Sequence, residues 1–254
     1  MSEMTARTLG TIEKAFFIIE QIRETGGAGV TELARRTDLH KSTVHSHLRT
    51  LVQCGYLVKE DDVYRLSLRF LAHGGRVRND MEIYQEGVSV IRDLASESGE
   101  LANLGVEENG KLVVIFMTEG ENAVHDRAPA GKYTDMHSTA MGKAILAHLP
   151  RERTERIIER HGLPARTENT ITDRAALSSE LEQIREDGFA IDDQEGHTGI
   201  SCIAAPVLHD DGTPIGGVSV TGPTRKLEDD EYRHSITQQI LKGANVIEVN
   251  IMYS

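Results

Sequence analysis

The feature that most constrains this chain is the stretch Gly29–Leu66, whose pattern is typical of a helix-turn-helix followed by a two-stranded wing. A short helix is expected to begin with a cap from the Thr31 hydroxyl. The polar segment Thr37–His40 is too short to continue that helix, so the chain turns there. A second helix begins at Lys41, and Gly55 is expected to follow it in the left-handed conformation. Its core-facing residues recur at spacings of three and four: Val44, Leu48, Leu51 and Val52.

The other face of the second helix carries hydrogen-bonding and cationic groups and no carboxylate. The major groove of DNA admits one helix, and such side chains read its base edges. This pattern predicts binding to double-stranded DNA. The expected contacts from this helix are Lys41, Ser42, Thr43, His45, Ser46 and Arg49. Expected phosphate contacts are Arg35 and Arg36 in the preceding helix and Arg65 in the wing.

Charge is distributed unevenly along the chain. The formal net charge is −12. Residues 1–75 carry ten Lys and Arg against nine Asp and Glu, whereas residues 76–254 carry eighteen against thirty-one. DNA phosphates repel an acidic body, so only the N-terminal part is expected to bind DNA. The alternative is a winged helix that binds a protein partner and leaves its polar face in water.

The composition also bears on the source and the compartment. An acidic surface with few lysines suits a high-salt cytoplasm, where screening removes self-repulsion, and it predicts a halophilic source. The chain has only Cys54 and Cys202, which favours a reducing cytoplasm over a disulfide framework. We expect no membrane span and no secretion signal, because no apolar run approaches ~18 residues and the N-terminus lacks the signal pattern.

A length of 254 residues favours two domains. We predict a winged helix-turn-helix domain over 1–75, a linker helix over 76–98 capped by Asn79 or Asp80, and a C-terminal domain over 99–254. Interleaved strands and helices make the predicted fold class α+β. Expected strands lie at 101–106, 111–117, 123–128, 188–192, 200–208 and 215–220. Expected helices lie at 138–149, 151–161, 174–187 and 229–251.

Two further helices are expected near the N-terminus. The first begins near Leu9 and runs to Ile22. Its apolar stripe comprises Ile12, Ala15, Phe16, Ile19 and Ile22. The second covers 67–75 and is expected to end at Gly74 and Gly75, because glycine disfavours helix continuation.

A small-molecule site is predicted in the C-terminal domain. Ser138 and Thr139 open a helix, and the free N–H groups of a first helical turn suit an anion such as a carboxylate. Ser219 and Thr221 share one face of a strand, and Cys202 lies on another strand. Together these groups predict a small polar pocket. The alternative is that Ser219 and Thr221 are ordinary strand residues and Cys202 a small core hydrophobe.

Several separate motifs occur in an order that resembles the IclR family of transcriptional regulators. The N-terminal motifs are TELARRT at 31–37, KSTVH at 41–45 and Gly55-Tyr56. The C-terminal motifs are HSTAMGKA at 137–144, Leu163 with TENTI at 167–171, GISCIAAPV at 199–207 and GGVSVTGP at 216–223. The resemblance covers nearly the whole chain, and it is specific because a helix-turn-helix alone would not give this order.

The resemblance implies a winged helix, a linker helix and a GAF-like effector-binding domain, which work as a homodimer or homotetramer on a palindromic operator. It also implies control of a catabolic operon by a small organic or sugar acid, and no cofactor. The implied effector contacts are the N–H groups of Ala140 and Met141, then Asp192, Cys202, Ser219 and Thr221, with Thr134 beside them. The sequence departs from the family pattern at Ser201, where the family often has Arg, and at the bulky Ala140-Met141 pair.

Enzymatic and metal-binding alternatives find less support in the sequence. A nucleophilic Cys202–His137 pair, as in a hydrolase, lacks a third group at a recognisable spacing to orient the base. On one helix, His45 and His47 point about 200° apart and cannot share an ion. We therefore predict a regulator rather than an enzyme, with neither catalytic residues nor a metal site.

Overall fold

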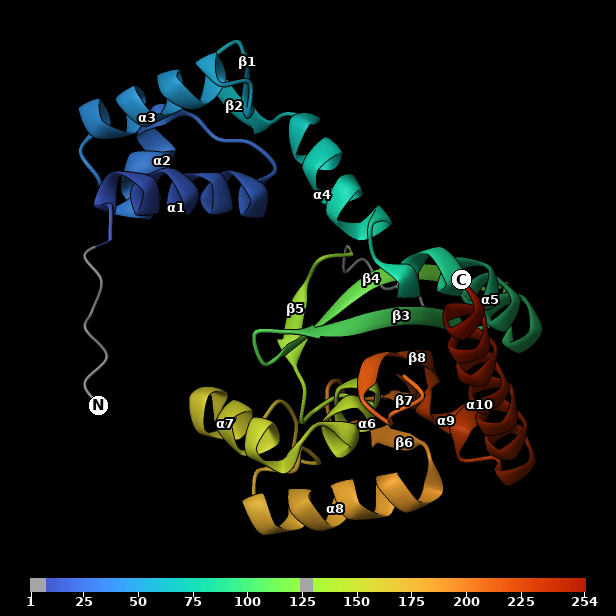
Figure 1. Cartoon of the computed structure of the whole chain (residues 1–254). Coiled ribbons are helices and arrows are strands. Elements are labelled where there is room, and N and C mark those ends of the chain that lie inside the picture. Colours follow the sequence, from blue (N-terminus) through green and yellow to red (C-terminus); the bar gives the residue numbers. More distant parts are fainter. Residues whose placement is uncertain (1–7, 124–129) are drawn as a thin grey trace. The chain divides into compact units, whose positions relative to one another are not determined.

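The computed structural model describes residues 8–123 and 130–254 (Figure 1). The chain divides into two compact units, one reaching to Val77 and one running from Arg78 to Ser254. Within the described ranges, no helix is long and apolar enough to cross a membrane. Of the strand expected over 123–128, all residues but Ala123 lie outside the described part of the chain.

The first unit is a winged helix-turn-helix, as the sequence predicts. Its elements are α1 (Gly10–Thr25), α2 (Val30–Thr37), α3 (Lys41–Gln53), β1 (Leu57–Glu60), β2 (Val63–Leu66) and α4 (Arg69–Asn79), the last of which continues beyond Val77. Strands β1 and β2 form the antiparallel wing. The core is built from all three N-terminal helices and the wing: Ile18, Ile22, Ala28, Leu33, Val44, Leu48, Leu57 and Tyr64.

Helix boundaries in this unit differ from expectation at two places. Helix α2 begins at Val30, after Gly29, without a side-chain cap, so the Thr31 hydroxyl does not serve as one. Helix α4 continues through Gly74 and Gly75, because the residues that follow them have no proline and favour a helix. The expectation for Gly55 is confirmed, since it follows α3 with φ of 79°.

Helix α1 turns a different face to the core than its apolar stripe suggested. Ile18, Ile19 and Ile22 are buried, whereas the Phe16 side chain is 61% exposed and Ile12 is 52% exposed. The stripe was assigned too far round the helix because the five successive apolar residues from Ala15 to Ile19 satisfy more than one helical face. The exposed side chains form an apolar surface on this unit.

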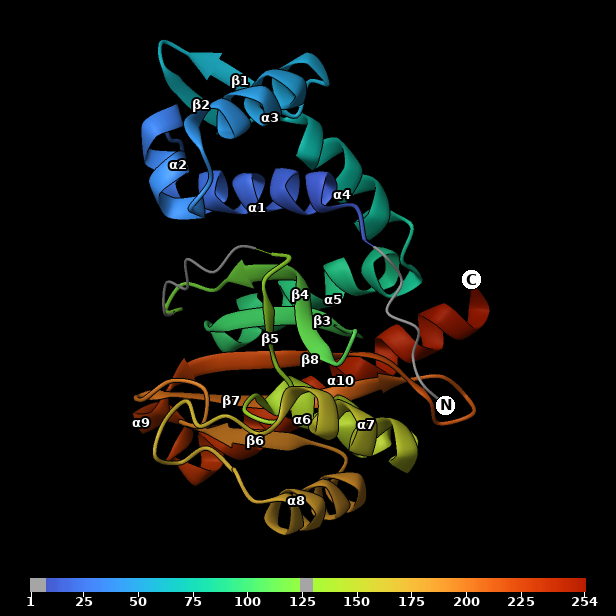
Figure 2. The ribbon, with the colours of Figure 1, turned by 90° about the vertical axis from the view of Figure 1, so that its left-hand side faces the viewer.

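The second unit is an α+β domain built on one antiparallel sheet, as predicted. Its strands are β3 (Leu101–Glu108), β4 (Lys111–Glu119), β5 (Tyr133–Asp135), β6 (Ala190–Asp193), β7 (Ile200–Leu208) and β8 (Pro214–Pro223). The six strands lie in the order β5-β4-β3-β8-β7-β6, and Figure 2 shows β3, β8, β7 and β6 following one another. Strand β5 is too short for the sequence pattern to have predicted it.

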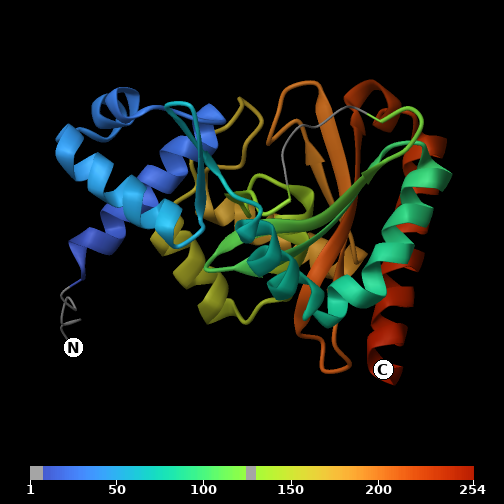
Figure 3. The ribbon, with the colours of Figure 1, turned by 90° about the horizontal axis from the view of Figure 1, so that it is seen from above.

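Helices cover both faces of this sheet. They are α5 (Glu82–Ser98), α6 (Ala140–His148), α7 (Arg151–His161), α8 (Arg174–Asp187), α9 (Thr224–Leu227) and α10 (Asp230–Tyr253). Helices α5 and α10 run side by side (Figure 3) and pack on one face, over Leu104, Val218 and Ile203. Helices α6 and α8 pack together on the other side, around Ala144 and Leu177.

Side-chain caps fix three of these helices. Asp173 caps α8 by accepting from the N–H of Ala176, and Asp229 caps α10 by accepting from the N–H of Tyr232. Thr139, rather than Ser138, caps α6. Helix α5 begins after Met81 without a side-chain cap, so neither Asn79 nor Asp80 has the expected role.

Candidate functional site

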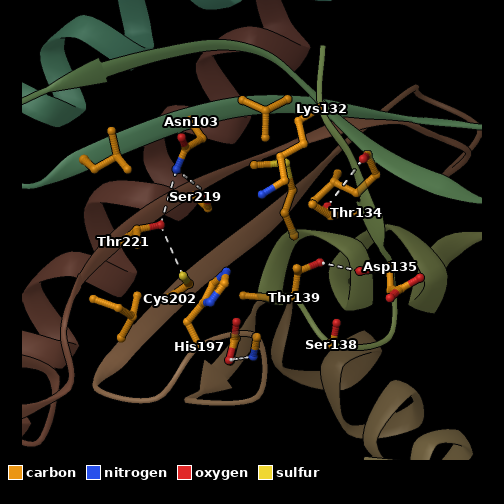
Figure 4. A pocket seen from close by; sticks show the side chains of 18 of the residues that line it. Asn103, Lys132, Thr134, Asp135, Ser138, Thr139, His197, Cys202, Ser219 and Thr221 are labelled. Carbon is orange, nitrogen blue, oxygen red and sulfur yellow. Dashed lines mark hydrogen bonds between the residues drawn. The ribbon is translucent and has the colours of Figure 1, made fainter. Parts of the chain in front are cut away.

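A cavity of about 680 Å³ lies between one face of the sheet and the N-terminus of α6. Alternate residues of β3 explain which side chains reach it, because Leu101 and Asn103 face the cavity while Ala102 and Leu104 face the core. Figure 4 shows Asn103, Ser219 and Thr221 on one side of the cavity and Ser138, Thr139 and Asp135 on the other.

One wall of the cavity is a hydrogen-bonded group on three neighbouring strands. Asn103 lies opposite Ser219, and Thr221 lies opposite Cys202. The Asn103 amide donates to the hydroxyls of Ser219 and Thr221, both at 3.3 Å. The Cys202 sulfur lies 3.1 Å from the Thr221 hydroxyl. This wall therefore presents an amide, two hydroxyls and a thiol to a bound molecule.

The opposite side of the cavity is the first turn of α6. The Thr139 hydroxyl accepts from the N–H of Gly142 at 3.2 Å. The N–H groups of Ala140 and Met141 lie in that turn, where a helix supplies no acceptors of its own. Ser138, only 3% exposed, also lines the cavity, and its hydroxyl has no hydrogen-bond partner among the described residues. These donors can bind an anion.

Asp135 is buried at the edge of the cavity between two cations. Its carboxylate accepts from the Lys111 ammonium at 2.5 Å and from the Arg166 Nε at 2.8 Å, with a further bond from the same guanidinium. Burial alone would raise the pKa of Asp135, but the bonds from Lys111 and Arg166 outweigh it and hold that pKa below its ordinary value. Asp135 is thus ionised, and Lys111 and Arg166 balance its negative charge.

Asp192 is the second carboxyl in the lining, and its pKa is shifted in the opposite direction. Its Oδ1 accepts from the N–H groups of Glu195 at 2.6 Å and Gly196 at 3.3 Å. Burial nevertheless raises the pKa of Asp192 from 3.8 to about 6, because the two backbone donors and the nearby Lys143 compensate only part of the lost hydration. The side chain can therefore change protonation state near neutral pH.

Asp192→Asn is expected to change how stability depends on pH. A carboxyl whose pKa is higher in the folded than in the unfolded chain binds more protons when folded, so its contribution falls as pH rises from about 4 to about 6. An asparagine oxygen can keep both backbone bonds without titrating. The free energy of unfolding of the variant, relative to that of the wild type, should therefore be up to about 3 kcal/mol larger above pH 6 than at pH 4. Urea unfolding at both pH values measures this, and parallel profiles for the two chains would contradict it.

Behind the cavity, a buried lysine holds the loop that follows Asp192 and strand β6. Lys143 on α6 is 1% exposed, and its ammonium donates to Glu195 at 2.5 Å and to Glu180 at 2.9 Å. Thr170 donates to the carbonyl of Glu195 at 2.7 Å. The loop after β6, including Gly196 and the cavity-lining His197, is thereby fixed to α6 and α8.

The cavity brings together every effector contact predicted from the sequence: Thr134, Ala140, Met141, Asp192, Cys202, Ser219 and Thr221. Their role in binding stays a prediction. The lining also contains residues that the sequence analysis missed: Asn103, Lys132, Asp135, Arg166 and His197. Only Asn103 carried a signal, as a polar residue within an apolar strand. Lys132, Arg166 and His197 lie in loops, where no periodicity predicts direction.

The structure does not support a nucleophilic Cys202–His137 pair. His137 is not part of the cavity lining, and its Nε2 lies 3.1 Å from the Pro164 carbonyl oxygen. Burial lowers the pKa of His137. Over residues 8–123 and 130–254, no group of three or more His, Cys, Asp or Glu side chains is placed to hold a metal ion.

On the first unit, most predicted DNA contacts share the outward face of α3. The side chains of Lys41, Ser42, His45, Ser46 and Arg49 are exposed and Thr43 is half-buried. Core residues Val44 and Leu48 hold the opposite face, so the register of α3 follows from its apolar spacing. The exposed face can enter a groove without disturbing the core.

The three predicted arginine contacts outside α3 differ in their partners. Arg36 donates to Gln21 at 2.8 Å and to Glu24 at 3.0 Å, which ties α2 to α1. Arg65 donates to the Gly26 carbonyl at 2.6 Å and lies 3.6 Å from Glu60. Arg35 is exposed. A phosphate would have to displace existing partners at Arg36 and Arg65, so Arg35 is the better placed of the three.

Both units of the chain are similar to parts of known proteins. Residues 76–249 match the family described as bacterial transcriptional regulator IclR C-terminal, and residues 11–61 match the IclR helix-turn-helix domain. The chain is 32% identical to the probable HTH-type transcriptional regulator ArcR of Halobacterium salinarum over 96% of this chain and 95% of that protein. It is 29% identical to the regulator KdgR of Escherichia coli over 90% and 88% of the two chains. The structure is similar to Thermotoga maritima IclR, with a TM-score of 0.81, 28% identity and coverage of 96% and 99%.

Proposed function

Because the chain belongs to the IclR family of transcriptional regulators, we propose that it controls a catabolic operon by binding a palindromic operator and sensing a small organic or sugar acid. The observation that carries the effector half is the cavity, where hydroxyl, amide and helix N-terminal donors converge. The exposed face of α3 supports the DNA-binding half. Effector binding can alter operator affinity only by favouring one arrangement of the DNA-binding domains over another.

The effector half is tested by a thermal-shift screen of the full chain with small carboxylates, sugar acids and aromatic acids. A ligand at 100 times its dissociation constant adds about 2.7 kcal/mol of stability. We expect such a compound to raise the melting temperature of the wild type and to lose most of this effect in Ser219→Ala/Thr221→Ala. An equal shift in both chains would show that the compound binds outside this cavity.

We also propose that the protein is a homodimer or homotetramer whose first units associate through exposed apolar side chains. On α1, Phe16 is 61% exposed and Phe17 46%, and near α4, Leu68 is 83% and Leu71 69% exposed. Exposed apolar residues of this size can mark association surfaces. A second copy of the chain is the partner that palindromic DNA requires.

Phe16→Ser/Leu71→Ser is expected to weaken this association, because it removes apolar surface buried between copies. Sedimentation velocity should show the variant shifted toward monomer at concentrations where the wild type is assembled. Val58→Ser is the matched control, since Val58 is 42% exposed but lies on the wing. An unchanged sedimentation profile for the double variant would contradict the proposed surface.

The working environment follows from the same proposal. We place the protein in the cytoplasm, where operator DNA lies, and in a halophilic host, which the net charge of −12 supports. High salt weakens long-range attraction to phosphates. DNA-binding assays should therefore be run across a range of salt concentrations.

A further inference from the structure

One cation reaches the cavity without a carboxylate partner in the described part of the chain. Lys132 lines the cavity, and Figure 4 shows its side chain pointing into the central space, as does that of His197. Among the residues that the structure describes, no carboxylate pairs with Lys132. Lys132 is an exposed residue, so water can hydrate its ammonium, and a ligand anion can take the place of that water.

The other charged groups of the lining leave a positive excess. Asp135 is compensated twice, by Lys111 and by Arg166. The Arg166 side chain remains 53% exposed, so its guanidinium can donate to a further group. Asp192 is the second carboxyl, and burial raises its pKa to about 6, so it stays largely ionised at pH 7. Lys111, Arg166 and Lys132 thus face two carboxylates, which leaves one more cation than carboxylates for a ligand group to match in this part of the cavity.

A separate anion site lies across the cavity at α6. The free N–H groups of its first turn are joined there by the Ser138 hydroxyl, which is buried, lines the cavity and has no hydrogen-bond partner in the described ranges. The Ser138 oxygen is open to the cavity, so a bound group can accept from its hydroxyl in place of water. The helix terminus and Ser138 thus point to a ligand oxygen at this position.

We infer that the effector carries two anionic groups, one held by Ser138 and the first turn of α6 and the other by the lining cations Lys132 and Arg166. This inference rests on the proposed effector-binding function and narrows its ligand class. The ligand is a dicarboxylate, or a carboxylate that also bears a phosphate. The hydroxyls of Ser219 and Thr221 and the Asn103 amide then face the middle of the molecule, where hydroxyl groups of the ligand would bind.

The test compares ligands that differ only in the second anion. Gluconate, glucarate and 6-phosphogluconate share a six-carbon hydroxylated chain, and 2-hydroxybutyrate and malate form a smaller pair. Binding to the full-length protein is measured by calorimetry for the wild type, Lys132→Gln and Ser138→Ala. Lys242→Gln is the matched control, because it removes the same charge from an exposed position on α10.

We expect at least one dianion to bind the wild type about tenfold or more tightly than its monoanionic partner, as a charge-assisted contact would give. Lys132→Gln should abolish this preference while Lys242→Gln keeps it, and Ser138→Ala should weaken both members of the pair. Comparing glucarate with 6-phosphogluconate separates a carboxylate from a phosphate at the second position.

Equal affinity for monoanion and dianion, or a preference that survives Lys132→Gln, would overturn the inference. Failure of every dianion to bind at millimolar concentration would overturn it as well. Operator binding by the same preparations is measured in parallel. If the protein still binds DNA while any of these overturning results is obtained, the proposed regulator function stands and only the dianionic ligand is rejected.

Discussion

Lys143→Met is expected to lower the free energy of unfolding of the C-terminal unit by about 3 kcal/mol or more. The substitution leaves the Glu195 carboxylate, whose side chain is 7% exposed, without its ammonium partner. Burial already raises the pKa of Glu195 while Lys143 opposes that rise, so the variant has to protonate or hydrate this carboxyl. Urea unfolding at neutral pH measures the loss.

A second substitution distinguishes lost charge pairing from lost packing. Lys143→Met/Glu195→Gln removes both buried charges and should recover most of the lost stability, because neutral replacement of a buried pair is often close to neutral in free energy. Glu180, the other partner of Lys143, is 36% exposed and can turn to water. A double variant less stable than Lys143→Met would show that the ion pair is not the origin of the effect.

Arg49→Ala and Thr43→Ala are each expected to weaken operator binding at least about fivefold without unfolding the protein. Both side chains lie on the outward half of α3, away from the core residues Val44 and Leu48. Loss of a base contact should also relax sequence preference, whereas loss of a phosphate contact should weaken binding uniformly and reduce its salt dependence. Retardation of operator DNA at two salt concentrations separates these outcomes.

The control for this pair is an arginine outside the proposed DNA-binding surface. Arg151→Ala removes an exposed cation on α7, where Glu155 is its partner at 2.9 Å. It should leave operator binding unchanged while altering the net charge as Arg49→Ala does. Unchanged retardation by both α3 variants would refute the assignment of α3 as the recognition helix.

The sequence predicted the elements whose patterns are local. Apolar spacing is sufficient for α3, and Asp173 and Asp229 mark the starts of α8 and α10 because their side chains bond within one turn. The lining residues Ser219 and Thr221 could be predicted for a similar reason, because residues two apart on a strand point to the same face of the sheet.

What the sequence could not predict depends on contacts between distant segments. Asn103 faces the cavity only because β3 pairs with β8, and Arg166 reaches it through its ion pair with Asp135. The burial of Lys143 was equally hidden, because its two acidic partners lie 37 and 52 residues further along the chain. Phe16 was wrongly predicted to face the core, because a continuous apolar run does not define one face of a helix.

Selection of genomic fragments by the full-length protein tests whether α3 reads a specific DNA site. The protein is incubated with sheared DNA of its host, and the retained fragments are sequenced for the wild type and for Arg49→Ala. We predict that the wild type enriches fragments sharing one palindromic sequence and that the variant enriches it weakly. Retention without a common sequence, or equal enrichment by both chains, would contradict the account.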